Sequence, residues 1–201
     1  MTNEVADLTL EGIVHDLNNV FQTIGETAEL LGSDPNWAKT ALTLLRSVDR
    51  GQRIVRSILD TNRSGAELAP IVDGSIQFSK DYLECIHGPK LDFRQEVDPG
   101  FRVQGHAAAW ERVLVNLFVN AAEAGAHSVL VEAHGTEIIV SDDGRGIEPE
   151  LLPRIFQPHV STKSMLSGVG LYVVQSIVEQ SGGSVTAENG SSGGALFRIR
   201  V

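Results

Sequence analysis

The segment Val140-Ser-Asp-Asp-Gly-Arg-Gly-Ile147 constrains the fold most, because an acid and two glycines follow the strand-like run Glu137–Val140. Gly144 and Gly146 can adopt positive φ, and they let another chemical group approach the backbone closely. A polar turn after a strand has the same composition when it stands alone. The segment therefore predicts a binding loop only in combination with other motifs along the chain.

The composition is typical of a globular protein. A length of 201 residues allows one or two small domains with real cores. The net charge of -10 argues against binding to nucleic acid, which favours a basic surface patch. The single cysteine, Cys85, excludes an internal disulfide and fits a reducing compartment. We therefore expect no nucleic-acid partner.

The sequence shows no sign of a membrane segment. Residues 1–7 carry acids and no basic region, unlike a secretory signal. The chain contains no apolar run of the 18 or more residues that a transmembrane helix needs. We therefore expect a cytoplasmic protein without direct membrane insertion.

Residues 1–66 read as a helical hairpin. Apolar residues recur at intervals of three and four between residues 8 and 31, and a second seam follows the break at residues 32–35. One hairpin cannot bury two narrow seams, whereas two copies can bury both in a four-helix bundle. Packing on the chain's own second domain is the alternative, but the seam favours a homodimer. The seams are Leu10, Ile13, Leu17, Val20, Ile24, Ala28 and Leu31, then Ala41, Leu45, Val48, Gln52, Val55 and Leu59.

Residues 67–201 form the second predicted domain, after a linker at Asn62–Ala66. Helices alternate with strand-like runs, and we expect the strands to be antiparallel. Such a mixture predicts a two-layer α/β sandwich, so the whole chain belongs to the α+β class. The predicted helices lie near 68–86, 107–125 and 170–181, and the strand-like runs near 91–96, 101–104, 128–133, 136–141, 183–188 and 195–201.

Four further segments accompany the loop after Val140, and together they give the chain a family resemblance. In their order along the sequence, they resemble the kinase core of two-component sensor histidine kinases, which joins a dimerisation and phosphotransfer hairpin to a GHKL-type ATP-binding domain. A typical member has an input part ahead of this core, so a separate sensor protein is considered as a partner. The segments are His15-Asp-Leu-Asn-Asn19, Asn116-Leu-Phe-Val-Asn120-Ala-Ala-Glu123, Ile155-Phe-Gln-Pro-His-Val-Ser-Thr-Lys163 and Ser167-Gly-Val-Gly-Leu171.

The resemblance implies that His15 accepts a phosphoryl group. His15 lies five residues after Leu10, about 140° around an α-helix, and therefore on the face away from the seam. A carboxylate next to an imidazole can hold one ring N–H, and Asp16 is placed for this role. Asn19 lies one turn further on the same face. In the family, a polar side chain at that place orients water for dephosphorylating the partner.

Asn116 and Asn120 share one face of a predicted apolar helix, where two amides need partners. The resemblance implies that Asn120 gives its side-chain oxygen to Mg²⁺, a hard cation that prefers oxygen ligands. It places Asn116 and Glu123 near the phosphates and the metal. Related ATPases carry a glutamate one turn before the metal asparagine to activate water. Because Asn116 stands there, we expect transfer to a protein side chain rather than hydrolysis.

The remaining nucleotide contacts are also implied by the resemblance. Asp142 would accept a hydrogen bond from the exocyclic amine of adenine, with Gly144 and Gly146 close to the base. Residues 157–169 correspond to the ATP lid, in which Leu166 takes the place of a usual glycine. The lid and the start of the next helix, whose N-terminal amides can face phosphates, contribute Lys163, Gly168, Gly170 and Leu171.

The predicted function is that of an ATP-dependent protein-histidine kinase. It would autophosphorylate His15 and pass the phosphoryl group to an aspartate in the receiver domain of a response regulator, and it would also act as a phosphatase of that regulator. One alternative is a dimeric phosphotransfer adaptor with a vestigial ATP-binding domain. Another is a serine kinase of the anti-sigma type. Nucleotide binding distinguishes the adaptor, and acid-labile phosphorylation distinguishes the serine kinase.

Overall fold

The computed structural model describes residues 10–32, 34, 36–59, 65–157, 170–191 and 193–201. The chain divides into two compact units, Met1–Asn62 and Arg63–Val201. Ala66, which the sequence assigned to the first domain, pairs with Val103 inside the second unit. Each unit is described by itself.

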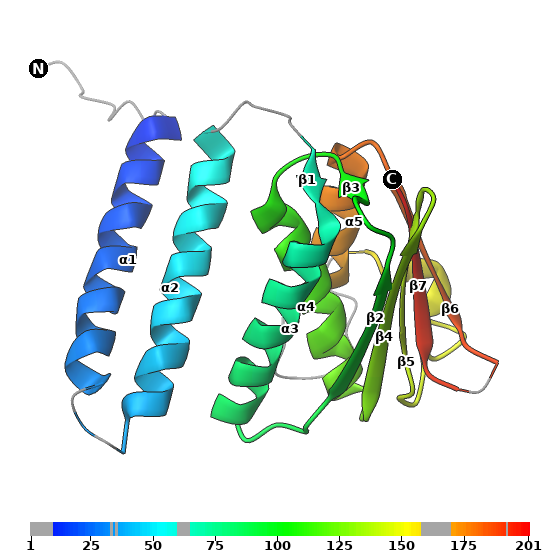
Figure 1. Cartoon of the computed structure of the whole chain (residues 1–201), viewed down its shortest axis with the longest axis horizontal. Coiled ribbons are helices and arrows are strands. Elements are labelled where there is room, and N and C mark those ends of the chain that lie inside the picture. Colours follow the sequence, from blue (N-terminus) through cyan, green and yellow to red (C-terminus); the bar gives the residue numbers. More distant parts are fainter. Residues whose placement is uncertain (1–9, 33, 35, 60–64, 158–169, 192) are drawn as a thin grey trace, which may run out of the picture. The chain divides into compact units, whose positions relative to one another are not determined.

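Unit 1 contains two helices, α1 (Leu10–Gly32) and α2 (Ala38–Leu59), which pack side by side (Figure 1). Small residues allow their close contact. A Cβ atom at Gly51 would lie 2.5 Å from the Phe21 ring, and one at Gly25 would lie 3.8 Å from Val48. The α1 residues that meet α2 therefore include Phe21 and Gly25, which lie outside the seam predicted from the sequence.

Much of the predicted α1 seam is exposed. Ile13, Leu17, Val20 and Ile24 repeat at intervals of four, three and four residues, so they form one stripe along the helix. Their exposed fractions range from 39% to 54%, which is high for large apolar side chains. We call these four residues the α1 stripe.

Unit 2 contains a five-stranded sheet with the strand order β2-β4-β5-β7-β6 and a separate two-stranded pair, β1 and β3. The helices α3, α4 and α5 lie on one face of the five-stranded sheet (Figure 1). In chain order, the elements are β1 (Ala66–Glu67), α3 (Leu68–Cys85), β2 (Asp92–Val97), β3 (Arg102–Val103), α4 (Ala107–Glu123), β4 (Ser128–His134), β5 (Glu137–Asp142), the 3-10 helix η1 (Leu152–Arg154), α5 (Gly170–Gln180), β6 (Ser184–Asn189) and β7 (Ala195–Arg200).

The sheet is mixed, so the prediction of purely antiparallel strands was wrong. β4, β5, β7 and β6 pair antiparallel in that order, whereas β2 and β4 run parallel. Parallel neighbours need a crossover connection, and the chain between β2 and β4 includes the 17-residue helix α4. Unit 2 nevertheless has the helix-on-sheet layers expected of the α+β class.

The core of unit 2 lies between the helices and the sheet. Trp110 and Phe118 of α4 are fully buried, together with Val131 and Ile138 on the adjacent strands. Burial alternates along β4, which directs every second side chain toward α4 and leaves the others on the open face of the sheet. The indole nitrogen of Trp110 donates a 2.8 Å hydrogen bond to the Gln104 carbonyl, so the buried ring keeps a polar partner.

Among the helices in the described part of the chain, none combines the length and the apolar character needed to cross a bilayer.

Candidate functional site

Asp142 ends β5 and is held by two backbone amides. Its Oδ1 accepts a hydrogen bond of 2.8 Å from the Gly144 N–H and a longer one of 3.3 Å from the Ala195 N–H. Burial raises the pKa of the Asp142 carboxyl above its usual range, although these two hydrogen bonds act to lower it. Within the described residues, no hydrogen bond engages its Oδ2. The carboxylate is therefore oriented by the fold and retains an acceptor for a ligand.

The neighbouring Asp143 is bound in a different way. Its Oδ1 accepts hydrogen bonds from the backbone amides of His127 and Ser128 at 2.7 and 2.9 Å, and its Oδ2 accepts one from the Ser128 hydroxyl at 3.0 Å. These bonds hold the pKa of Asp143 below its usual range. Asp143 thus anchors the beginning of β4 to the end of β5, and its acceptors are already occupied.

The glycines after Asp142 are required by close packing. A Cβ atom at Gly144 would lie 3.0 Å from the Ala124 side chain, where α4 ends. Gly146 has a φ of +73°, and a Cβ atom there would lie 2.8 Å from Asn189 Oδ1. The Arg145 N–H also donates to the Ala124 carbonyl at 3.1 Å. The loop is therefore docked against the end of α4, which links Asp142 to the helix that carries Asn116 and Asn120.

Two residues of this loop environment were missed in the sequence. Asn189, at the end of β6, accepts from the Ile147 N–H and donates to the Ile147 carbonyl, both at 2.7 Å. Gly194 has a φ of +76°, and a Cβ atom there would overlap the Asp142 carbonyl oxygen. The run Asn189–Gly194 indicates a turn between strands. Its contact with a loop 42 residues away has no local signal.

On α4, Asn116, Asn120 and Glu123 follow one another at intervals of four and three, so they share a face of the helix. A Cβ atom at Gly170, the first residue of α5, would lie 3.4 Å from Asn116 Oδ1. The Asn120 side-chain nitrogen is buried without a hydrogen-bond partner among the described residues. A buried unpaired amide is unusual in a folded protein, and a bound ligand is one explanation for it.

Lys163, Leu166 and Gly168, which the sequence predicts to lie in an ATP lid, are outside the described residues. Gly170 and Leu171 begin α5, and Leu171 packs half-buried against the core of unit 2. The structure thus brings Asp142, the glycine loop, α4 and the start of α5 into one unit.

The residues that the sequence predicts for phosphotransfer belong to α1 in unit 1. Asp16 and Asn19 are exposed, whereas the His15 side chain is not among those described. The Asn19 carbonyl accepts a hydrogen bond from the Thr23 hydroxyl at 3.0 Å.

Comparison with known proteins identifies relatives of both units. Residues 105–201 match the family model described as histidine kinase-, DNA gyrase B- and HSP90-like ATPase. Sensor histidine kinase ZraS of Klebsiella oxytoca is 32% identical over 205 residues, covering 92% of this chain and 44% of that protein. ZraS of Salmonella typhimurium is 40% identical over 206 residues, with 94% and 44% covered. Sensor protein FixL of Bradyrhizobium diazoefficiens is 33% identical over 211 residues, with 94% and 42% covered. The chain therefore spans less than half the length of these curated relatives.

Solved structures show the same fold. The nucleotide-free catalytic domain of histidine kinase ThkA has a TM-score of 0.57 and is 26% identical, covering 70% of this chain and 95% of that one. Full-length ShkA, solved in complex with AMPPNP, has a TM-score of 0.59 and is 18% identical, covering 94% of this chain and 44% of that one.

Proposed function

The chain belongs to the two-component sensor histidine kinases, and on that premise we propose that it uses ATP to phosphorylate its own His15. The observation that carries this proposal is the geometry around Asp142. A partly buried carboxylate retains an acceptor oxygen at the end of β5, and the glycine loop beside it rests on α4, which carries a buried unpaired amide. A site that served only for docking would not need this arrangement.

We assign the residues of the site as follows. Asp142 accepts a hydrogen bond from the exocyclic amine of adenine, which distinguishes adenine from guanine. The unpaired side-chain nitrogen of Asn120 would donate to a ligand at this position, while its side-chain oxygen is suited to Mg²⁺. Asn116 and Glu123 share its helix face and would border the phosphates. When bound, Mg²⁺ would neutralise part of the negative charge of the phosphates. Lys163 of the predicted lid would neutralise more of it.

The proposed reaction transfers one phosphoryl group twice. An unprotonated ring nitrogen of His15 bonds to the γ-phosphorus of ATP, while the bond from this phosphorus to the bridging oxygen breaks and ADP leaves. Asp16 holds the other ring nitrogen in its protonated form, so that the attacking nitrogen keeps its lone pair. A carboxylate of a response regulator receiver domain then takes the phosphoryl group from His15, and Asn19 would orient the water that later removes it.

We further propose that two copies associate through unit 1. The α1 stripe supports this, because four large apolar side chains lie on one face of α1 and remain exposed. A second copy would bury them in a four-helix bundle.

Incubation of the purified chain with Mg²⁺ and γ-labelled ATP tests the proposal. We expect an acid-labile, alkali-stable label, the behaviour of a phosphoramidate. His15→Gln should abolish the label while ATP binding stays unchanged, since His15 belongs to unit 1. A label that persists in this variant, or that survives acid, contradicts the assignment of His15. Failure of the wild-type chain to bind ATP would instead favour the phosphotransfer adaptor.

A further inference from the structure

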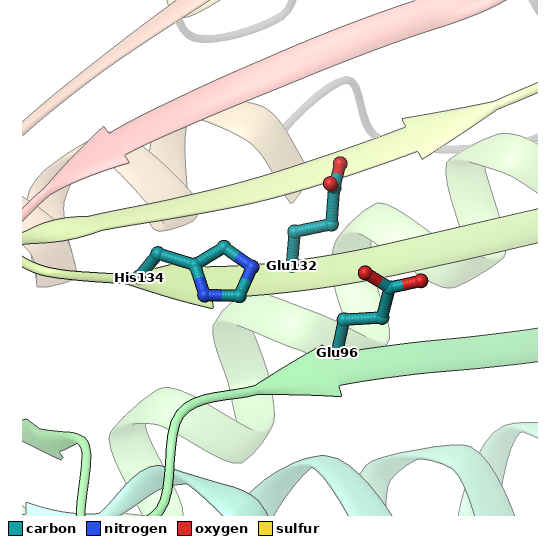
Figure 2. A group of neighbouring side chains, drawn as sticks. All are labelled: Glu96, Glu132 and His134. Carbon is teal, nitrogen blue, oxygen red and sulfur yellow. The ribbon is translucent and has the colours of Figure 1, made fainter.

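A second group of polar side chains lies on the open face of the sheet in unit 2. Glu96 of β2 and Glu132 of β4 are direct partners in the parallel strand register. His134 follows Glu132 by two residues, so it lies on the same face of β4. The three residues offer one ligand atom each, and these atoms lie within 4.8 Å of one another. Figure 2 shows the ring nitrogen of His134 that is farther from the backbone, Nε2, pointing toward the two carboxylates.

The other ring nitrogen of His134 is held by Asp98. His134 Nδ1 lies 2.9 Å from Asp98 Oδ1. Asp98 is itself positioned by backbone contacts, because its N–H donates to the Ala133 carbonyl at 2.9 Å and its Oδ2 accepts from the Gly135 N–H at 3.4 Å. A carboxylate that accepts a hydrogen bond from Nδ1–H favours the tautomer whose lone pair lies on Nε2. This is the arrangement by which proteins orient histidines that bind metal ions.

In the described part of the sheet, the two glutamates face each other without a lysine or arginine partner, and His134 is the basic side chain within their cluster. Like charges directly opposite each other on neighbouring strands destabilise a sheet. No lysine or arginine of the described residues forms an ion pair with Glu96 or Glu132. Elsewhere on the same sheet, Glu137 pairs with Arg198 at 3.1 Å and with Arg200 at 3.0 Å. A bound cation would give the Glu96–Glu132 pair the compensation that Glu137 obtains from arginine.

We propose that Glu96, Glu132 and His134 Nε2 bind a divalent metal ion of the Zn²⁺ class, with Asp98 as the positioning residue. A mixed imidazole and carboxylate set suits Zn²⁺ and its transition-metal neighbours, whereas Mg²⁺ prefers oxygen alone. Three protein ligands leave a fourth tetrahedral position for water. Ligand atoms around Zn²⁺ are separated by about 3.3 Å, so the side chains need to close from their present spacing, which the exposed Glu96 and the half-buried Glu132 can do by rotation.

This site is separate from the proposed nucleotide site. His134 pairs with Glu137 at the beginning of β5, while Asp142 ends the same strand, about 17 Å away along its length. A metal ion there would link β2 to β4, the only parallel pair of strands in the described sheet. Its expected effect is therefore on the stability of unit 2 rather than on phosphoryl transfer.

Calorimetric titration of the chelator-treated chain with ZnCl₂ at pH 7.5 tests the proposal. We expect one site of micromolar affinity, weakened at least tenfold in His134→Ala and several-fold in Glu96→Gln and in Glu132→Gln. His127→Ala removes another exposed histidine of unit 2 and should leave this site unchanged. Millimolar MgCl₂ should not displace the zinc, and CoCl₂ should show the absorption of a nitrogen- and oxygen-ligated ion that is lost in His134→Ala.

Circular dichroism of each variant verifies folding, and Glu96→Gln keeps the test informative if His134→Ala unfolds. Equal zinc affinity in the wild type, His134→Ala and Glu96→Gln would overturn the proposal. So would the absence of binding to the wild-type chain at 100-fold higher zinc than the expected dissociation constant, since His134 would then form only an ion pair with Asp98.

Discussion

The two units differ in how completely they bury their apolar side chains. In unit 2, Trp110, Phe118 and Ile199 are fully excluded from solvent between the helices and the sheet. In unit 1, Val20 is 54% exposed, and three more large apolar residues lie beside it on the α1 stripe. Exposed apolar patches of this kind mark sites of association. The described residues of the proposed nucleotide site thus lie within unit 2, whereas the α1 stripe supports the proposed association of two copies through unit 1.

The largest effect is predicted for charges on the α1 stripe. Leu17→Asp combined with Ile24→Asp should convert the proposed dimer to a monomer at micromolar concentration. Burying two unpaired carboxylates costs several kcal/mol, which raises the dissociation constant of the dimer by more than about 100-fold. Light scattering coupled to gel filtration measures the change in mass.

Leu30→Asp is the matched control for this pair. Leu30 is 77% exposed, and it lies on a different face of α1 from the stripe. The same substitution there should leave the dimer intact. The comparison fails if wild type is already monomeric, or if Leu30→Asp dissociates it as well.

A smaller, contrasting pair of effects is predicted for the two neighbouring acids of unit 2. Burial raises the pKa of Asp142, so its ionisation opposes folding once the pH rises through this pKa. Asp142→Asn should therefore keep or raise the melting temperature at pH 7. It should nevertheless weaken ATP binding roughly 10- to 150-fold, because a hydrogen bond to a charged group contributes about 1.5–3 kcal/mol.

Asp143→Asn should do the reverse. The pKa of Asp143 is lowered by hydrogen bonds from Ser128 and His127, so this carboxylate stabilises the fold above its usual pKa and loses that effect as the pH falls. Its replacement should lower the melting temperature by a few degrees while ATP binding by the folded protein changes little. Calorimetry measures the ATP affinity of both variants, and thermal unfolding measures their melting temperatures. Unchanged ATP affinity in Asp142→Asn would remove its adenine role.

Most strands and helices of unit 2 could be predicted because they have a local signal, whereas the two-residue strand β1 and the 3-10 helix η1 were not predicted. The run Ser128–His134 alternates in burial as a half-buried strand should, and the apolar face of Ala107–Glu123 packs into the core. The parallel pairing of β2 with β4 could not be predicted from either strand. It depends on where the intervening helix packs, which is a property of the tertiary structure.

The site divides in the same way between local motifs and distant contacts. Asp142, Gly144 and Gly146 lie within five residues of one another in the sequence, so the sequence could predict a binding loop there. The sequence did not reveal that Asp143 is structural, because its partners, His127 and Ser128, are 16 and 15 residues away at the beginning of β4. Asn189 was missed because its role depends on hydrogen bonds to the backbone of Ile147, which is 42 residues away in the sequence.

Asn189→Ala should weaken both the fold and the nucleotide site of unit 2. It removes two hydrogen bonds to Ile147 and leaves the N–H and carbonyl of that residue without these partners. The cost is about 1–3 kcal/mol in the free energy of unfolding, measured by urea denaturation. ATP affinity should fall several-fold, because Gly146 loses the side chain that packs against it. Thr186→Ala, an exposed position on the same strand, is the control. Equal stability of the two variants would show that Ile147 is held by other contacts.

The smallest effect is predicted at the exposed end of unit 2, where Asp98 meets His134. The hydrogen bond that His134 donates to Asp98 raises the pKa of His134 above its ordinary 6.5, so its stabilising effect is complete below that value and is lost as the pH rises through the raised pKa. The same bond lowers the pKa of Asp98 below its ordinary 3.8, so the carboxylate contributes above that value and loses its effect as the pH falls. The pair should therefore be most stabilising between these two ordinary values.

Melting temperatures measured with EDTA present test this prediction. Near pH 5.5, the melting temperature of wild type should exceed that of Asp98→Asn by a degree or two, because an exposed ion pair is weak. The difference should shrink by pH 8.5. A difference in melting temperature that grows with pH would contradict the assigned ion pair. A difference as large as that expected for a substitution in the buried core would show that this exposed pair stabilises unit 2 as strongly as core packing does.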